Sequence, residues 1–245
     1  MADDVAATLA AARAVGVERV VHVGCAPDSM ARAVELAAAH DDVYAVVGVH
    51  PHEARLLDDE VFTRLEALLD APKVVALGET GLDYHYDRSP RDVQREALAR
   101  QADLAARKHL PLVLHVRDAH EDALEVLAGV DLPRGGIVHC FTGDAATARA
   151  WLDRGFHVSF SGIVTFPKAP EVAEAARVVP DDRLLLETDA PYLAPVPVRG
   201  RKNTPANVAF TCAFVARLRG VPPEELAHQT ALNAQSLLNL PAGGA

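Results

Sequence analysis

Apolar, β-branched runs alternate along this chain with longer amphipathic segments rich in Ala, Leu, Glu and Arg. Short apolar runs predict strands buried on both faces, and segments with a period near 3.6 residues predict helices that cover them. The seven predicted strands are Val17–Val23, Val43–Val49, Val74–Leu77, Leu112–Val116, Gly136–Cys140, His157–Ser161 and Leu184–Glu187. This alternation predicts an α/β fold with a parallel sheet.

The helix boundaries carry their own signals. Ser89 and Pro90 precede a helix predicted over Asp92–Lys108, and Thr204 with Pro205 begins another. A closing helix is predicted over Pro223–Leu240, and an opening helix over residues 3–14. Because no Gly/Ser-rich linker interrupts the pattern, we expect residues 1–245 to form a single domain.

Two layouts of such a sheet compete: an open doubly wound sheet and a closed (β/α)8 barrel. A nucleotide-binding open sheet would carry Gly-x-Gly-x-x-Gly after its first strand, but Val23–Pro27 lacks that pattern. Polar residues instead cluster at the C-terminal ends of several strands, where barrel active sites lie. We therefore predict a TIM-type barrel of seven strands, with the first strand missing because a helix opens the chain.

Four ionisable residues at successive strand ends carry the predicted chemistry. Glu79, His115, His139 and Asp189 each follow an apolar run, and one or two βα units of roughly 30 residues separate them. A lone histidine at such a position is usually a packed residue, but acids in apolar strands are hard to explain by packing. Together the four residues predict a site for Zn²⁺ or Mn²⁺ at one end of the barrel.

Composition limits the function classes further. The formal net charge of −10 argues against a protein that coats polyanions, although an enzyme meeting a nucleic acid locally remains compatible with it. The longest apolar stretch, about 43–49, is too short to span a membrane. No secretory signal is visible at the N-terminus, and the three cysteines are widely spaced, so we expect a cytoplasmic protein with reduced thiols.

Short motifs surround these strand ends in a fixed order. They are Gly48–His52 (GVHPH), Gly78–Tyr84 (GETGLDY), Leu114–Ala119 (LHVRDA), His139–Gly143 (HCFTG), Glu187–Leu193 (ETDAPYL) and Pro195–Pro205 (PVPVRGRKNTP). In this order they resemble the successive motifs of the TatD-type metal-dependent deoxyribonucleases. The resemblance covers essentially the whole chain, and the ordered set is far more specific than any single motif.

The resemblance implies a (β/α)8 barrel with two divalent ions (Mg²⁺, Mn²⁺ or Zn²⁺) that hydrolyses phosphodiesters in DNA, often as a 3′–5′ exonuclease on single strands. By the same resemblance, Glu79 would bridge the two ions, and His115 and His139 would bind one of them. Asp189 would bind the other ion and act as general base toward the attacking water. Single-stranded DNA is thus the expected partner, and a monomer is the default expectation.

One feature of the family is absent from the sequence. The family's first strand ends in a His-x-His pair that completes one metal site, and nothing here precedes the first helix. We therefore expect one ion held by Glu79, His115 and His139, and a weaker second site with only Glu79 and Asp189. A start codon placed too far downstream would explain this, and an inactive or weakened remnant is the alternative.

Several residues are expected to contact substrate. The resemblance places His50 near the substrate phosphate, and Arg117, two residues after His115, is placed to reach a phosphate. Arg199 and Arg201 belong to the only compact basic cluster, which could contact a nucleic-acid backbone. A surface ion pair is the alternative for Arg117, and a solvated charge run is the alternative for Arg199 and Arg201. A hydrolase of another ester, an amide or a lactone on the same barrel is the competing function, because fold does not fix substrate.

The remaining polar residues near the site are interpreted as supporting groups. Asp83, expected in a loop over the site, and Glu187, deeper on the last strand, are predicted partners of the metal ligands. His52 and His85 are interpreted as loop residues. Strand alternation predicts that Cys140 points outward into the helix layer as a packing residue.

Overall fold

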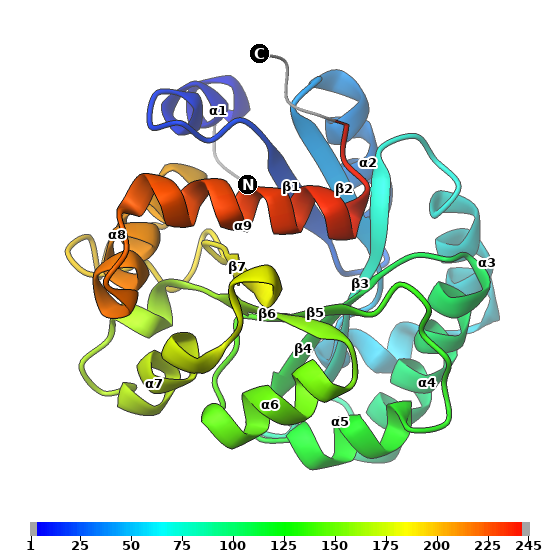
Figure 1. Cartoon of the computed structure of the whole chain (residues 1–245). Coiled ribbons are helices and arrows are strands. Elements are labelled where there is room, and N and C mark those ends of the chain that lie inside the picture. Colours follow the sequence, from blue (N-terminus) through cyan, green and yellow to red (C-terminus); the bar gives the residue numbers. More distant parts are fainter. Residues whose placement is uncertain (1–3, 242–245) are drawn as a thin grey trace. The chain divides into compact units, whose positions relative to one another are not determined.

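The computed structural model describes residues 4–241, which fall into two units. The first, the β1–β5 unit, comprises residues 19–139 and 237–239. The second, the β6–β7 unit, comprises residues 4–18, 140–236 and 240–241. Figure 1 follows the elements of each unit along the chain.

Five parallel strands form the core of the β1–β5 unit, each paired with the next in chain order. They are β1 (Val20–Gly24), β2 (Val43–Val47), β3 (Val74–Asp83), β4 (Leu112–Arg117) and β5 (Gly136–His139). Every residue of β2 is buried, as expected for a strand covered on both faces. All C-terminal strand ends therefore lie at the same edge of this sheet.

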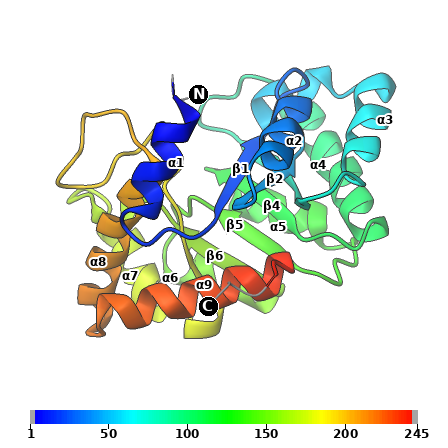
Figure 2. The same ribbon diagram turned by 90° about the horizontal axis from the view of Figure 1, so that it is seen from above.

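Helices connect and cover these strands. They are α2 (Met30–Ala39), the 3-10 helix η1 (Pro51–Leu56), α3 (Asp59–Leu68), α4 (Arg91–Arg107) and α5 (His120–Leu127). Helix α2 packs its buried face, Met30, Ala33 and Ala37, on β1 and β2. Helix α4 packs on β3, and Figure 2 shows α2, α3 and α4 on the same side of β1 and β2.

A bulge in β3 sets the direction of Glu79. Gly78 pairs with Val113 and Thr80 pairs with Leu114, so Glu79 is an extra residue without a partner on β4. Such bulges re-aim a side chain next to functional sites. Gly81 is required close by, because its φ is +141° and a Cβ there would lie 1.9 Å from the carbonyl oxygen of His115.

Two glutamines of α4 bind the strand ends to the helix layer. Gln101 accepts from the Val49 N–H at 2.8 Å and donates to the Val49 carbonyl at 3.1 Å and to Thr80 Oγ1 at 2.6 Å. Gln94 accepts from the Asp83 N–H at 2.8 Å. Both glutamine side chains are fully buried. Seven residues apart, they lie on one helix face and satisfy backbone groups that strand pairing leaves open.

The β6–β7 unit is built around two parallel strands, β6 (Phe156–Phe160) and β7 (Leu184–Leu186). Its helices are α1 (Val5–Arg13), α6 (Ala145–Asp153), α7 (Pro170–Val178), α8 (Val208–Arg219) and α9 (Pro223–Leu238), the last belonging to this unit up to residue 236. Its short 3-10 helices are η2 (Gly162–Thr165), η3 (Asp181–Arg183) and η4 (Pro205–Asn207).

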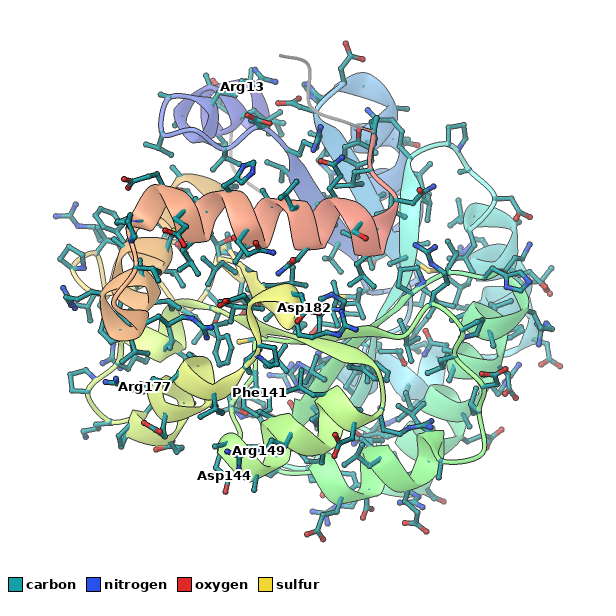
Figure 3. All side chains as sticks on the ribbon, in the orientation of Figure 1. Arg13, Phe141, Asp144, Arg149, Arg177 and Asp182 are labelled. Carbon is teal, nitrogen blue, oxygen red and sulfur yellow. The ribbon has the colours of Figure 1, made fainter. Side chains whose placement is uncertain are left out.

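Side-chain contacts hold the elements of the β6–β7 unit together. The Phe141 and Phe160 rings meet edge to face, with centroids 5.9 Å apart. Asn233 of α9 donates to the Leu184 carbonyl at the start of β7 at 2.9 Å. Asp144, at the exposed start of α6 in Figure 3, caps the helix by accepting from the Thr147 N–H at 2.8 Å.

All seven predicted strands are confirmed, with shifted ends. The largest shift is in β3, which runs on to Asp83 because the Gly-rich segment continues its pairing with β4. The opening helix is α1, capped by Asp4, while Asp3 lies outside the described residues. Within residues 4–241 no strand precedes α1. No helix among these residues is long and apolar enough to cross a membrane.

The prediction for Cys140 is wrong in its geometry. Strand β5 ends at His139, and Cys140 has a left-handed backbone with φ of 46°, so strand alternation does not apply to it. Its Sγ lies 3.1 Å from Ser161 Oγ instead of packing as an outward-facing strand residue.

Candidate metal centre

Three imidazole rings surround one carboxylate oxygen in the β1–β5 unit. Glu79 Oε1 lies 3.0 Å from His115 Nδ1, 3.4 Å from His139 Nε2 and 3.5 Å from His50 Nε2. The Glu79 side chain is 12% exposed, and the histidine side chains are 13–19% exposed. Three nitrogens around one shielded carboxylate oxygen form a candidate centre for a cation.

The strand register explains this convergence. His115 of β4 is paired with Gly81 of β3 on one side and with His139 of β5 on the other, so the two histidines lie side by side. The β3 bulge brings Glu79 toward them. His50 follows β2 and immediately precedes Pro51, the first residue of η1. Residues that are distant in the sequence thus meet because their strands end at the same edge.

The distances fit a divalent ion. Ligands at about 2.0–2.1 Å from a tetrahedral Zn²⁺ are separated from each other by about 3.3 Å. The separations of 3.0 Å and 3.4 Å from Glu79 to His115 and His139 agree with that spacing. One carboxylate oxygen and imidazole nitrogens are ligands that Zn²⁺ and Mn²⁺ accept. The ligand atoms of His50, Glu79 and His115 all lie within 4.8 Å of one another, so residues of this cluster fit a metal ion.

Asp83 fixes the orientation of His115. Asp83 Oδ2 lies 3.0 Å from His115 Nε2, and the Asp83 side chain is fully buried. A carboxylate accepts, so the Nε2 proton points to Asp83 and the Nδ1 lone pair of neutral His115 points toward Glu79. Two acceptors facing each other at 3.0 Å repel unless a proton or a cation lies between them. This carboxylate–histidine pair is the arrangement that orients metal-binding imidazoles.

His50 has the opposite proton arrangement. Its Nδ1 accepts from the His52 N–H at 3.1 Å, so neutral His50 carries its proton on Nε2, which faces Glu79. A protonated nitrogen donates a hydrogen bond and does not bind a metal. His115 is thus set up as a ligand, and His50 as a donor toward the site.

Charge keeps the carboxylates of the site ionised. Burial alone would raise the pKa of Glu79, but the charge of His139 and hydrogen bonds from His115 and His50 hold that pKa well below its usual range. Burial also works against ionisation of Asp83, and hydrogen bonds from His115 and the Tyr86 N–H lower its pKa. Hydrogen bonds to Asp83 and Glu79 raise the pKa of His115 despite its burial.

Asp83 binds more groups than its predicted place in a loop indicated. It is the last residue of β3, and its Oδ2 also lies 2.9 Å from His52 Nε2. Its Oδ1 accepts from the N–H groups of His85 at 3.1 Å and Tyr86 at 2.8 Å. The interpretation of His52 as a plain loop residue is therefore wrong, because its ring is mostly buried in η1 and paired with Asp83.

The other predicted site residues are spread over both units. Arg117 ends β4 with its guanidinium 5.0 Å from the centre of the Tyr86 ring. Glu187 and Asp189 follow β7 in the β6–β7 unit, where Glu187 Oε1 accepts from the Cys140 N–H at 3.1 Å. Arg199 lies over the Phe166 ring at 4.0 Å, and Arg201 is exposed in the same segment. The residues that meet in the β1–β5 unit are Glu79, His115, His139 and the donor His50.

The sequence alone did not identify three residues that support the site: His52, Gln94 and Gln101. A signal existed for the glutamines, since they occupy the apolar face of an amphipathic helix where polar residues need a partner. For His52 the signal was weaker. Pro51 starts a short helix, and only the tertiary fold brings its ring to Asp83.

Known proteins share this arrangement of sequence and fold. The family model of TatD related DNase matches residues 1–239. The uncharacterized metal-dependent hydrolase YabD of Bacillus subtilis is 42% identical over 231 residues, covering 94% of this chain and 90% of YabD. The 3′-5′ ssDNA/RNA exonuclease TatD of Cronobacter sakazakii is 37% identical over 235 residues, 94% of this chain and 89% of that protein.

A crystal structure extends the likeness to three dimensions. YjjV, a TatD homolog from Escherichia coli, matches with a TM-score of 0.92 and 33% identity, covering 96% of this chain and 92% of YjjV. The predicted fold class, a parallel α/β fold of the TIM-barrel type with seven strands in residues 4–241, is confirmed.

Proposed function

The chain belongs to the TatD family of metal-dependent hydrolases, and on this premise we propose that it removes nucleotides from the 3′ end of single-stranded DNA. The proposal rests on the three imidazole nitrogens that lie within 3.5 Å of Glu79 Oε1. The relative from Cronobacter sakazakii, named a 3′-5′ ssDNA/RNA exonuclease, supports the choice of substrate. In the proposed reaction a water oxygen attacks phosphorus, the bond from phosphorus to the 3′ oxygen breaks, and a nucleoside 5′-monophosphate leaves.

In this proposal Glu79, His115 and His139 would hold one divalent ion (Mg²⁺, Mn²⁺ or Zn²⁺), and the family resemblance implies a second ion bound by Glu79 and Asp189. A divalent ion at such a site lets water act as a nucleophile near neutral pH and offsets negative charge on phosphate oxygens. Glu79 contributes a carboxylate that stays ionised, because neighbouring imidazoles lower its pKa. Asp83 holds the ring of His115 in one orientation.

The remaining residues act on the substrate or on the attacking water. His50, with its proton on Nε2, donates a hydrogen bond to a phosphate oxygen and so helps to orient the scissile group. Asp189 accepts the proton of the attacking water, as the family resemblance implies. Arg117, Arg199 and Arg201 contribute positive charge toward the nucleic-acid backbone.

The test is a nuclease assay on a 5′-labelled single-stranded oligonucleotide with Mg²⁺ or Mn²⁺. The proposal predicts a ladder shortening from the 3′ end, no products with EDTA, and no products from circular single-stranded DNA. Glu79→Gln keeps the size of the side chain but removes its charge, and it is expected to reduce the rate by more than about 100-fold. Asp118→Asn, an exposed carboxylate of the same unit, is the matched control. Turnover of carboxyl esters or lactones but not of DNA would replace the proposal with the competing hydrolase function.

A further inference from the structure

Tyr86 presents an aromatic ring to solvent directly beside the candidate metal centre. It lies three residues beyond the end of β3, and 52% of its surface is exposed. Arg88 and Arg117 place their guanidinium groups 5.6 Å and 5.0 Å from the centre of its ring. An exposed aromatic ring beside two cations offers a ligand both a flat apolar face and positive charge.

The charges of these two arginines are not neutralised by the protein. Within residues 4–241 neither Arg88 nor Arg117 forms an ion pair, although acidic groups lie nearby. Asp87 pairs instead with Arg91 at 3.1 Å, and Asp118 pairs with His85 at 3.1 Å. The guanidinium groups at Tyr86 therefore remain available to an anion from solution.

The main chain fixes Tyr86 to the same carboxylate that orients His115. The Tyr86 N–H donates to Asp83 Oδ1 at 2.8 Å, while Asp83 Oδ2 accepts from His115. On its inner side the Tyr86 ring meets His52 edge to face at 5.6 Å, and the His52 ring is 6.1 Å from that of His115. Asp83 and His52 thus connect Tyr86 to His115 of the candidate metal centre.

We propose that Tyr86, Arg88 and Arg117 form a nucleotide-binding platform for single-stranded nucleic acid. An unpaired base takes the place of a guanidinium group over the Tyr86 ring, and the two arginines pair with the adjoining phosphates. This combination of a stacking ring and flanking cations binds single strands with little sequence preference, since every base has a flat face and every nucleotide a phosphate. Bases inside a duplex are stacked between their neighbours and offer no free face, so the platform selects single strands. The proposal rests on the nuclease function proposed above.

The experiment compares an intact oligonucleotide with oligonucleotides carrying an abasic site at one of the three 3′-terminal positions. At the position that stacks on Tyr86, loss of the base is expected to reduce kcat/KM of the unmodified protein by about 10-fold. Tyr86→Ala should remove this difference, with equal values for intact and abasic DNA. Tyr86→Phe keeps the ring and should retain the difference.

The cations are tested through the dependence of binding on salt. Fluorescence anisotropy of a labelled oligonucleotide in EDTA measures binding without turnover. Arg88→Ala and Arg117→Ala should each lower the slope of log affinity against log salt by about 0.7, the value for one phosphate contact on a single strand. Arg91→Ala removes the same charge from the first residue of α4, three residues after Arg88, but Arg91 is paired with Asp87, so its slope should match that of the unmodified protein.

The outcomes separate this inference from the proposed function. If the protein degrades DNA and Tyr86→Ala still discriminates intact from abasic ends at all three positions, the platform is refuted and the nuclease function stands. If the unmodified protein degrades no DNA, the nuclease function is refuted, and the platform stands or falls by the salt slopes measured in EDTA. Calorimetric titration with Mn²⁺ shows that the variants act on the substrate and not on the metal centre, because Tyr86→Ala leaves the bond from His115 to Asp83 intact.

Discussion

Two aspartates in the β1–β5 unit contact histidines at nearly the same distance but in very different surroundings. Asp83 lies 2.9 Å from His52 and 3.0 Å from His115, and it is fully buried. Asp118 lies 3.1 Å from His85, but its side chain is 67% exposed and that of His85 is 47% exposed. Distance alone would rank the two aspartates as equals.

Burial and the number of partners separate them. Asp83 accepts from two imidazoles and two backbone N–H groups, and their combined effect lowers its pKa although burial opposes ionisation. Asp118 is surrounded by water, which screens its charge and offers replacement hydrogen bonds at little cost. A functional carboxylate is therefore identified by what it would leave unpaired if it were removed.

The largest effect is expected from Asp83→Asn. The amide has one acceptor oxygen where the carboxylate has two, so His115 loses its fixed tautomer or the backbone N–H groups lose their partner. The affinity for Mn²⁺ or Zn²⁺, measured by calorimetric titration, should fall by about 10–100-fold. An unchanged affinity would mean that Asp83 does not control the orientation of His115.

The contribution of Asp83 to the free energy of unfolding of the metal-free protein should depend on pH. Because Asp83 and Glu79 have folded-state pKa values below their ordinary ones, they stabilise the fold above about pH 4, and this contribution is lost as the pH falls toward the lowered values. The difference in free energy of unfolding between the unmodified protein and Asp83→Asn should thus be largest near pH 6 and shrink below pH 4. Denaturant titrations in EDTA measure it, and a constant difference would contradict the linkage.

His115 should make the metal-free protein less stable at higher pH. Its folded-state pKa is raised, so its contribution is complete below about pH 6.5 and is lost as the pH rises through the raised value. The stability of the metal-free protein should therefore decline on both sides of an optimum between the carboxyl and imidazole ranges. Asp118→Asn should leave this profile in place.

A smaller effect is expected at His52, which acts on His115 only through Asp83. His52→Leu fills the space but removes the 2.9 Å contact to Asp83 Oδ2, and the metal affinity should drop by about 3–10-fold. His52→Gln carries an amide nitrogen at a similar reach and should restore most of the affinity. A role in packing alone would give the same affinity for both variants, and this result would remove His52 from the site.

The sequence predicted the strand layout well because buried parallel strands read as uninterrupted apolar runs, as in β2 and β4. It also singled out Glu79, His115 and His139, since ionisable residues at the ends of such runs need a partner. Register could not be predicted, so the extension of β3 to Asp83 and the bulge at Glu79 were missed. The contacts of Gln94, Gln101 and His52 join segments that are distant in sequence, and no local pattern encodes them.

The smallest effect is expected from Asp118→Asn, which tests whether burial distinguishes Asp83 from Asp118. The exposed contact to His85 should contribute at most about 1 kcal/mol to the free energy of unfolding, and less in high salt. Metal affinity should not change, because within residues 4–241 the side chains of Asp118 and His85 make no contact with Glu79, Asp83 or the histidines that these two acids contact. A loss of Mn²⁺ affinity comparable to that of Asp83→Asn would show that the two pairs act together through the segment between β3 and β4. Burial would then no longer distinguish them, and the loop that carries Tyr86 would have to be treated as part of the metal centre.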